Sequence, residues 1–220
     1  CINERRHQLH EVIRLSGMNL IVNDIDQPLI IKVASIPQAR MQVYFIDNEE
    51  YFKRKFTTED KKGTFYQDND ERAIFFCRGV IESVKKLGWS PDVIHCNGWM
   101  ASFLPMYLKK FYHDDPIFEK TKIVVSLYNQ SFEGTLSDDL GDKLKFDGHS
   151  EDDIKGFEKA DYKKLTETAI NYSDAVVKGS TELDEDLLKL IEESKLPTLE
   201  YADGEYKEQY KPFYETLFEE

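Results

Sequence analysis

Short runs of β-branched and aromatic residues, separated by turn residues, predict the strands of this protein. Runs of this kind, bounded by Gly, Pro, Asn, Asp or Ser, are typical of β-strands. Pro37 opens a three-residue turn between the first two runs. The predicted strands span residues 28–35, 41–46, 92–95, 122–127 and 175–178.

Apolar residues at three- and four-residue steps predict the helices, most clearly from Asp70 onward. Asn69 or Asp70 is expected to cap this helix, and Gly88 to end it. Its stripe is expected to pack on the strands through Ile74, Cys77, Ile81 and Val84. Further helices are predicted near residues 99–111, 152–160, 162–172, 184–194 and 204–218.

The sequence also predicts details of these helices and of one loop. Leu104, Tyr107, Leu108 and Phe111 should face inward from the helix at 99–111. Asp184 should cap the helix at 184–194, and Pro212 should kink or split the last helix. Residues 130–148 should form a long loop with three glycines.

The opening stretch, residues 9–20, leaves two interpretations. Leu9, Val12 and Ile13 suit a helix that ends at Gly17, whereas the alternation that continues to Leu20 suits strands, which we favour. Strands that alternate with helices through short links predict an α/β fold. We expect a Rossmann-like parallel sheet with helices on both faces.

Composition narrows the class of protein. The chain has 220 residues, which suits a single α/β domain, and a formal net charge of −13, which disfavours nucleic acid as a partner. It contains no apolar run of the roughly 20 residues needed to cross a membrane. Its three cysteines, Cys1, Cys77 and Cys96, show no paired spacing, so reduced thiols and a cytoplasmic location are expected.

Candidate chemistry gathers after two of the predicted strands. Ligands bind beyond the carboxyl ends of the strands in open parallel sheets. There the chain reads His95-Cys96-Asn97-Gly98-Trp99, and Tyr128-Asn129 continuing to Gly134. The Trp99 ring could either stack on a sugar ring or pack in the core. His95 could orient a hydroxyl group or only brace its loop.

Other chemistry finds little support. The nucleotide loops GxGxxG and GxxxxGK[ST] are absent, as is the GxSxG nucleophile motif. His7 and His10 stand three residues apart, but no Cys or carboxylate pattern completes a metal site around them. We therefore expect neither a metal nor a cofactor.

Several motifs in order resemble the glycogen/starch synthases of the ADP-glucose type. DNDERAIFFCRGVIESVKKLGWSPDVIHCNGWMASFLPMYLKKFY resembles the family pattern DNxERFxFFxRAxLE…GWxPDVVHxHDWQTALxPxYLK. Upstream, VYFIDNEEYFKRK resembles VYFIDNxxYFxR. Downstream, KIVVSLYNQSFEGTL and AINYSDAVVKGSTEL resemble KxVFTIHNLAYQGxF and GLxYADxIxTVSPTY. The resemblance runs collinearly from about Tyr44 to Leu183.

The resemblance implies a fold and a reaction. The family has two Rossmann-like domains that face a cleft, the GT-B arrangement, and residues 1–220 would form the N-terminal, acceptor-side domain. The family transfers glucose from ADP-glucose to an α-1,4-glucan without a metal. The residues implied to bind substrate are His95, Trp99, Tyr128, Asn129 and Gly134. The implied ligands are an α-glucan or a nucleotide sugar.

Departures from the family pattern argue against transfer by this chain alone. Asn97 and Gly98 replace the second His and the Asp of HxHDW, and Tyr128 replaces the His of TIHN. The KxGGL segment and the nucleotide-sugar domain are not in this sequence. Without groups that neutralise the leaving diphosphate, its transition state lacks several kcal/mol of stabilisation.

Three functional alternatives remain. The chain is half of a synthase that needs a partner domain, encoded with it or supplied by a protein partner, or it is a non-catalytic glucan-binding or regulatory scaffold of glycogen metabolism. The third alternative, from outside the family, is an envelope lipoprotein anchored at Cys1. An encoded second domain would favour the first alternative, a stop codon near Glu220 the second, and an apolar signal before Cys1 the third.

Overall fold

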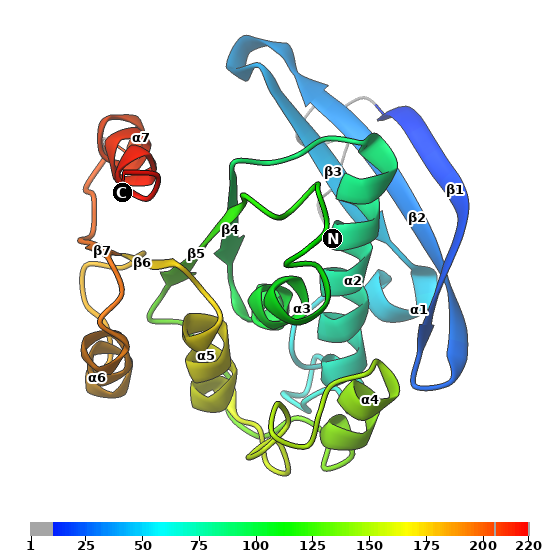
Figure 1. Ribbon diagram of the computed structural model, residues 1–220. Coiled ribbons are helices and arrows are strands. Elements are labelled where there is room, and N and C mark those ends of the chain that lie inside the picture. Colours follow the sequence, from blue (N-terminus) through cyan, green and yellow to red (C-terminus); the bar gives the residue numbers. More distant parts are fainter. Residues whose placement is uncertain (1–10, 205, 220) are drawn as a thin grey trace.

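The computed structural model describes residues 11–204 and 206–219, and Cys1, His7 and His10 therefore lie outside it. Two sheets organise the described residues (Figure 1). The first is antiparallel and has three strands in sequence order. These are β1 (Glu11–Val22), β2 (Ile25–Ile36) and β3 (Met41–Asp47).

The antiparallel sheet confirms the strand interpretation of the opening stretch from residue 11 on. Asn23 and Asp24 both have positive φ, 50° and 61°, as a two-residue hairpin turn between twisted strands requires. Between β2 and β3, Pro37–Ala39 form a short 3-10 helix at the predicted turn. The helical alternative for this stretch is wrong for the described residues.

The second sheet is parallel and has four strands. Three of them are the predicted neighbours: β4 (Val93–Asn97), β5 (Lys122–Leu127) and β6 (Ala175–Lys178). The fourth, β7 (Thr198–Leu199), has only two residues and no sequence signal of its own. β5 is buried along nearly its whole length, which explains its continuous apolar sequence.

Helices cover both faces of the parallel sheet, as expected. One face packs on the main core through α3 (Leu104–Phe111), α5 (Tyr162–Asn171) and α6 (Glu185–Ser194). The other face carries α7 (Tyr206–Thr216), which covers Val124 and Val177. Figure 1 shows α7 on the opposite side of this sheet from α3 and α5.

The helix predicted from Asp70 is α2 (Asn69–Leu87), and Gly88 ends it in the left-handed region at φ 63°. Ile74, Cys77 and Ile81 are buried as expected. Their stripe shares one core with Cys96 of β4 and with Ile123 and Val125 of β5. α2 also lies between the two sheets (Figure 1) and packs on β1, β3, α3 and the 3-10 helix Trp99–Ala101. The rest of the cover of the parallel strands comes from α3, α5, α6 and α7.

The N-cap residue of α2 was predicted wrongly, although the Asp70 carboxylate accepts a hydrogen bond of 2.8 Å from the Glu71 N–H in the first turn. Asp68 stands at the N-cap of α2 without a side-chain bond to the helix, and it pairs with Arg54 through two hydrogen bonds of 2.6 and 2.5 Å. Asp184 occupies the N-cap position of α6, as predicted, although its side chain makes no capping bond. In α3, Phe111 is 41% exposed, although it was expected to face inward with Leu104.

The region after β5 departs most from expectation. The predicted loop 130–148 contains α4 (Leu140–Phe146), whereas residues 152–160 form turns rather than a helix. In α4, Leu140, Lys143 and Leu144 are buried, and the Lys143 ammonium lies 2.7 Å from Asp70 at the start of α2. Leu140 and Leu144 give a helical signal of one turn only, which the three glycines of this stretch outweighed in the prediction.

α7 continues through Pro212, so the proline does not split it. The short α1 (Glu49–Phe52) precedes the loop that leads to α2. The Asn48 side chain caps α1 by accepting a hydrogen bond of 2.9 Å from the Tyr51 N–H. Tyr51 is buried, which fixes the end of β3 next to α2.

Candidate functional site

A cleft of about 390 Å³ lies at the carboxyl ends of β4 and β5, where the sequence placed the candidate chemistry. Three stretches distant in sequence contribute to it, namely Thr57–Thr58, Asn97–Met100 and the segment from Tyr128 onward. No residue in its lining is charged. Its aromatic lining residues are Trp99, Tyr128, Phe132 and Tyr162, and its polar ones are Thr57, Thr58, Asn97, Gln130 and Ser131.

Three aromatic rings form one continuous wall of this cleft. The Trp99 and Phe132 rings meet edge to face with centroids 5.6 Å apart, and Phe132 meets Tyr162 in the same way at 5.7 Å. Trp99 is half-buried, so it packs on the core and still borders the cleft. Aromatic pairs in this geometry stabilise each other beyond the area they bury, which holds the wall in place.

Tyr128 also lines the cleft. Its hydroxyl donates a hydrogen bond of 2.7 Å to Oδ1 of Asn97, which joins the ends of β5 and β4. Its ring lies against the backbone of Gly179, where an added Cβ would stand 2.5 Å from a ring carbon. Gly98, at φ 78°, has no atom within 4 Å of its Cβ position and leaves that side of the cleft open.

His95 lies outside this lining, on the face of β4 that α7 covers. Its Nδ1 is 2.6 Å from the Tyr214 hydroxyl and its Nε2 is 2.7 Å from Oγ of Ser126. Burial lowers the pKa of His95 to about 4, so the ring is neutral at pH 7. The Nδ1 contact holds α7 on the sheet and the Nε2 contact joins β4 to β5, so both ring nitrogens serve the structure, which favours the bracing alternative.

Asn129 and Gly134 belong to the rim rather than to the cleft. The Asn129 N–H donates to Oγ of Ser180 at 3.1 Å, and its amide nitrogen, correctly oriented, donates to the Asp184 carboxylate at 2.7 Å. Gly134, at φ 105°, lines a neighbouring hollow of about 670 Å³ that shares Phe132 and Tyr162 with the cleft. That hollow also contains Asp161 and Asp184 and is acidic.

Of the five residues predicted to bind substrate, the structure thus brings only Trp99 and Tyr128 into the cleft lining. Sequence reasoning missed Phe132 and Tyr162, which complete the aromatic wall, and the polar pair Thr57 and Thr58. Phe132 lies within a motif already quoted, so it could have been found. Nothing in the sequence around Thr57 or Tyr162 indicates that they meet across the cleft.

Comparison with known protein families shows to which family this chain belongs. The model of the starch synthase catalytic domain matches residues 1–198. The chain belongs to this family. Glycogen synthase from Chlorobium luteolum is 39% identical over 144 residues, which cover 65% of this chain and 29% of that protein. Glycogen synthase from Chlorobaculum parvum is 35% identical over 182 residues, covering 81% and 36%.

A solved structure shows the same fold. The catalytic domain of starch synthase IV from Arabidopsis thaliana, bound to ADP and acarbose, matches 87% of this chain and 41% of its own chain. The TM-score is 0.65 at 16% identity, so this likeness concerns the fold alone. The chain therefore has the α/β architecture of a GT-B starch synthase domain, and it spans about a third of the length of the glycogen synthases it matches.

Three residues that differ from the family motifs lie next to one another at the cleft. Asn97 and Tyr128 each stand where the family pattern has His, and they are hydrogen-bonded to each other. Gly179 stands where the pattern TVSP has Val, and it makes the room that the Tyr128 ring occupies. Three differences between residues 97 and 179 thus form a single set of contacts, in which an amide and a phenol replace two imidazole rings.

Proposed function

We propose that this chain is the glucan-binding part of a glycogen synthase-type glycosyltransferase. The ligand of the cleft is a run of glucosyl units of an α-1,4-glucan, and the family reaction transfers glucose to that glucan from ADP-glucose. The observation that carries this proposal is an uncharged cleft whose lining combines an aromatic wall with amide and hydroxyl groups. Neutral sugars are polyhydroxylated on their edges and apolar on their faces, and this lining matches both.

The same observation disfavours the nucleotide sugar as the ligand of this cleft. A diphosphate requires Arg, Lys, a metal or a row of backbone N–H groups to balance its charge. No lining residue is cationic, and the neighbouring hollow carries carboxylates. We therefore assign the glucan, rather than ADP-glucose, to the cleft.

The proposal extends to activity. Glucosyl transfer needs groups that stabilise the charge developing on the diphosphate, and these are worth several kcal/mol in the transition state. The cleft offers a tyrosine hydroxyl and an amide instead. We propose that the 220-residue chain does not transfer glucose alone, and that the synthase reaction requires a further domain or a protein partner that binds the nucleotide sugar.

A non-catalytic scaffold of glycogen metabolism is the second candidate. The hydrogen-bonded pair of Asn97 and Tyr128 favours it, because neither side chain is a cation at pH 7. Glucan binding is common to both candidates. Only an assay with ADP-glucose and glycogen separates them, after the isolated chain is combined with a nucleotide-sugar domain from a related synthase.

The proposal includes the cellular compartment of the protein. Cys77 and Cys96 are buried free thiols, which suit a reducing compartment, and we propose the cytoplasm. Among the described residues, no helix is both long and apolar enough to cross a membrane.

An amide-resolved NMR titration with maltoheptaose tests the glucan assignment. Shifts are expected to gather at Trp99, Tyr128 and Phe132, with a Kd on the order of 1 mM, which corresponds to about 4 kcal/mol. Trp99→Ala should abolish them, whereas Phe146→Ala, at an exposed position on α4, should not. A titration with ADP-glucose that moves the same signals, while maltoheptaose moves none, would reverse the assignment.

A further inference from the structure

The acidic hollow beside the candidate cleft adjoins it directly. The hollow has a volume of about 670 Å³ and shares Ser131, Phe132 and Tyr162 with the lining of the cleft. The rings of Phe132 and Tyr162 meet edge to face with centroids 5.7 Å apart. The last two rings of the aromatic wall therefore border both spaces, and a ligand that lies along this wall can reach from one space into the other.

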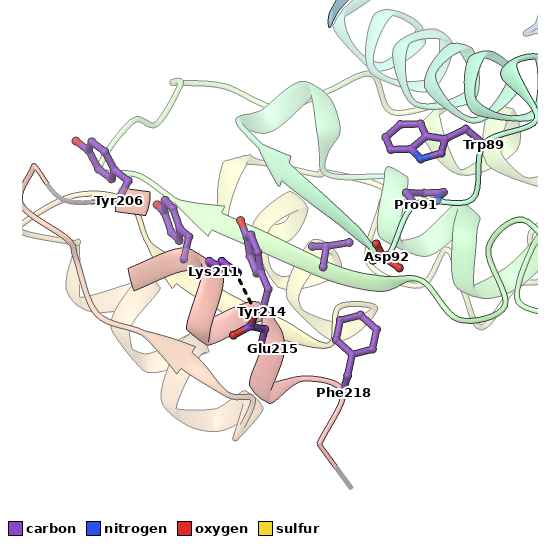
Figure 2. A pocket seen from close by; sticks show the side chains of 10 residues that line it. Trp89, Pro91, Asp92, Tyr206, Lys211, Tyr214, Glu215 and Phe218 are labelled. Carbon is purple, nitrogen blue, oxygen red and sulfur yellow. Dashed lines mark ion pairs between the residues drawn. The ribbon is translucent and has the colours of Figure 1, made fainter. Parts of the chain in front are cut away.

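A larger groove in another part of the molecule lacks this connection. It has a volume of about 830 Å³ and lies between α7 and Trp89 (Figure 2). Among the described residues, none lines both this groove and the cleft. Its walls are mostly apolar, and its Lys211 and Glu215 pair with each other at 3.8 Å. Of the two spaces, only the acidic hollow can extend the cleft.

Three segments of the chain build the acidic hollow. One is the stretch 131–135 after β5, and the others are the starts of α5 and α6. The Leu136 N–H donates to the Ala160 carbonyl at 2.8 Å, which ties the first segment to the chain just before α5. Leu187 of α6 is 3% exposed and adds a buried apolar side chain to the lining. Packed helices thus define the shape of the hollow.

Three carboxylates of the hollow are each held by a hydrogen-bond donor. The amide nitrogen of Asn129, correctly oriented, lies 2.7 and 2.9 Å from the two oxygens of Asp184. Asp161 accepts a backbone N–H of α5 at 2.8 Å, and Asp186 accepts from the Lys163 ammonium at 2.9 Å. An ionised carboxylate has about four acceptor positions, so each of the three can accept further donors. Acceptors that are already oriented lose little freedom when a ligand binds.

This lining matches the chemistry of a sugar. Hydroxyl groups are donors, and their hydrogen bonds to a carboxylate are roughly twice as strong as those to a neutral acceptor. The apolar faces of glucosyl units fit the rings of Phe132 and Tyr162. The lining has four carboxylates and a single ammonium group, that of Lys163, so it repels phosphate.

We propose that the acidic hollow binds further glucosyl units of the α-1,4-glucan, beyond those in the cleft. This inference rests on the proposed function, because it continues the same ligand into the adjoining space. The glucan passes Phe132 and Tyr162, and its hydroxyl groups donate to the carboxylates of Asp161 and Asp184. The substrate class is then a neutral glucan longer than the cleft alone accommodates, and a glucan that carries phosphate is disfavoured.

Titrations of the ¹⁵N-labelled chain with maltotriose and maltoheptaose test this inference. Maltoheptaose should shift the amide signals of Gly134 and Lys163 in the hollow as well as that of Trp99 in the cleft. Asp184→Ala should weaken maltoheptaose binding by about tenfold and leave the Kd of maltotriose, followed at Trp99, unchanged. Asp152→Ala removes the same charge at an exposed position outside the hollow and should change neither Kd. Trp89→Ala, in the other groove, should change neither as well.

Three results would overturn this inference and leave the proposed function standing or falling separately. If maltoheptaose shifts Trp99 but neither Gly134 nor Lys163, the glucan ends in the cleft and the proposed function stands. An equal loss of affinity for both oligosaccharides in Asp184→Ala would show that Asp184 acts on the cleft instead. If spermidine, but not maltoheptaose, shifts Gly134 and Lys163, the hollow is a cation site. When neither oligosaccharide shifts Trp99, the proposed function fails together with the inference. Amide spectra of the free Asp184→Ala chain verify that it is folded.

Discussion

A Cβ atom at Gly179 would lie 2.5 Å from the ring of Tyr128, which is closer than two unbonded carbon atoms approach in proteins. The absence of a side chain at one position thus determines the place of the aromatic ring at the other. Because the Tyr128 hydroxyl in turn bonds to Asn97, Gly179 also acts on the shape of the candidate cleft. Gly179 is a positioning residue, since it does not line the cleft itself.

Gly179→Ala is expected to displace the Tyr128 ring and to weaken maltoheptaose binding by about tenfold, or 1.4 kcal/mol. It should also destabilise the fold by about 1–3 kcal/mol through overpacking. In a Tyr128→Ala background the stability cost should largely disappear, because the two sites are in contact. Gly141→Ala serves as the control, since its Cβ would meet Ile154 at an ordinary 3.5 Å. Equal costs in the two backgrounds would refute the coupling.

Ile81→Ala should lower the free energy of unfolding by about 2–5 kcal/mol, because this side chain is 1% exposed on the buried stripe of α2. Leu87→Ala, at a 39% exposed position on the same helix, should cost much less. Urea unfolding of both variants measures the difference. A cost for Ile81→Ala below about 0.5 kcal/mol would place the stripe at the surface.

Lys143→Met should be among the most destabilising single changes. The Lys143 ammonium lies 2.7 Å from Asp70, 3.0 Å from Glu71 and 3.1 Å from Asp139, and Asp70 is fully buried. Removing the cation leaves an uncompensated buried carboxylate, at a cost of about 3–5 kcal/mol. Adding Asp70→Asn should recover part of this cost, because the orphaned charge is removed. Lys145→Met, at a position 38% exposed, is the matched control in thermal unfolding.

Stability is expected to fall as the pH decreases from about 6.5 to 4. Burial lowers the pKa values of His95 and His149 to about 4, so the unfolded chain binds protons in this range that the folded chain does not. The stabilisation is complete above the unfolded pKa near 6.5 and is lost as the pH falls toward 4. Thermal unfolding of the intact chain at pH 7 and pH 5 measures the effect.

His149→Phe isolates one contribution to this pH dependence. The His149 ring lies between Tyr107 and Phe111, with centroids 4.9 and 4.6 Å away, and neither ring nitrogen has a hydrogen-bond partner among the described residues. Phe removes two unsatisfied buried atoms and keeps the aromatic contacts, so a gain of about 1–3 kcal/mol is expected. The fall in stability between pH 7 and 5 should become smaller. An unchanged pH profile would show that His149 does not titrate in this range.

The sequence by itself determined the elements whose signal is local. Two strands are β-branched runs of consecutive residues, at 122–127 and 175–178. The apolar stripe of α2 repeats over consecutive helical turns. Periodicity along the sequence therefore identifies all three elements. The family motifs are also short stretches of consecutive residues. They place Trp99 and Tyr128 at the carboxyl edge of the sheet. Hydrophobic spacing along a short segment is sufficient for predictions of this kind.

The tertiary structure alone decided what depends on contacts between distant segments. His95 is held by Tyr214, 119 residues away, and is thereby removed from the cleft in which the motif had placed it. The ion pair between Lys143 of α4 and Asp70 of α2 joins residues 73 positions apart, and the Tyr128 ring has room because residue 179 is a glycine. The energy of such contacts depends on side chains that meet only in the folded chain, and no pattern along the sequence records it.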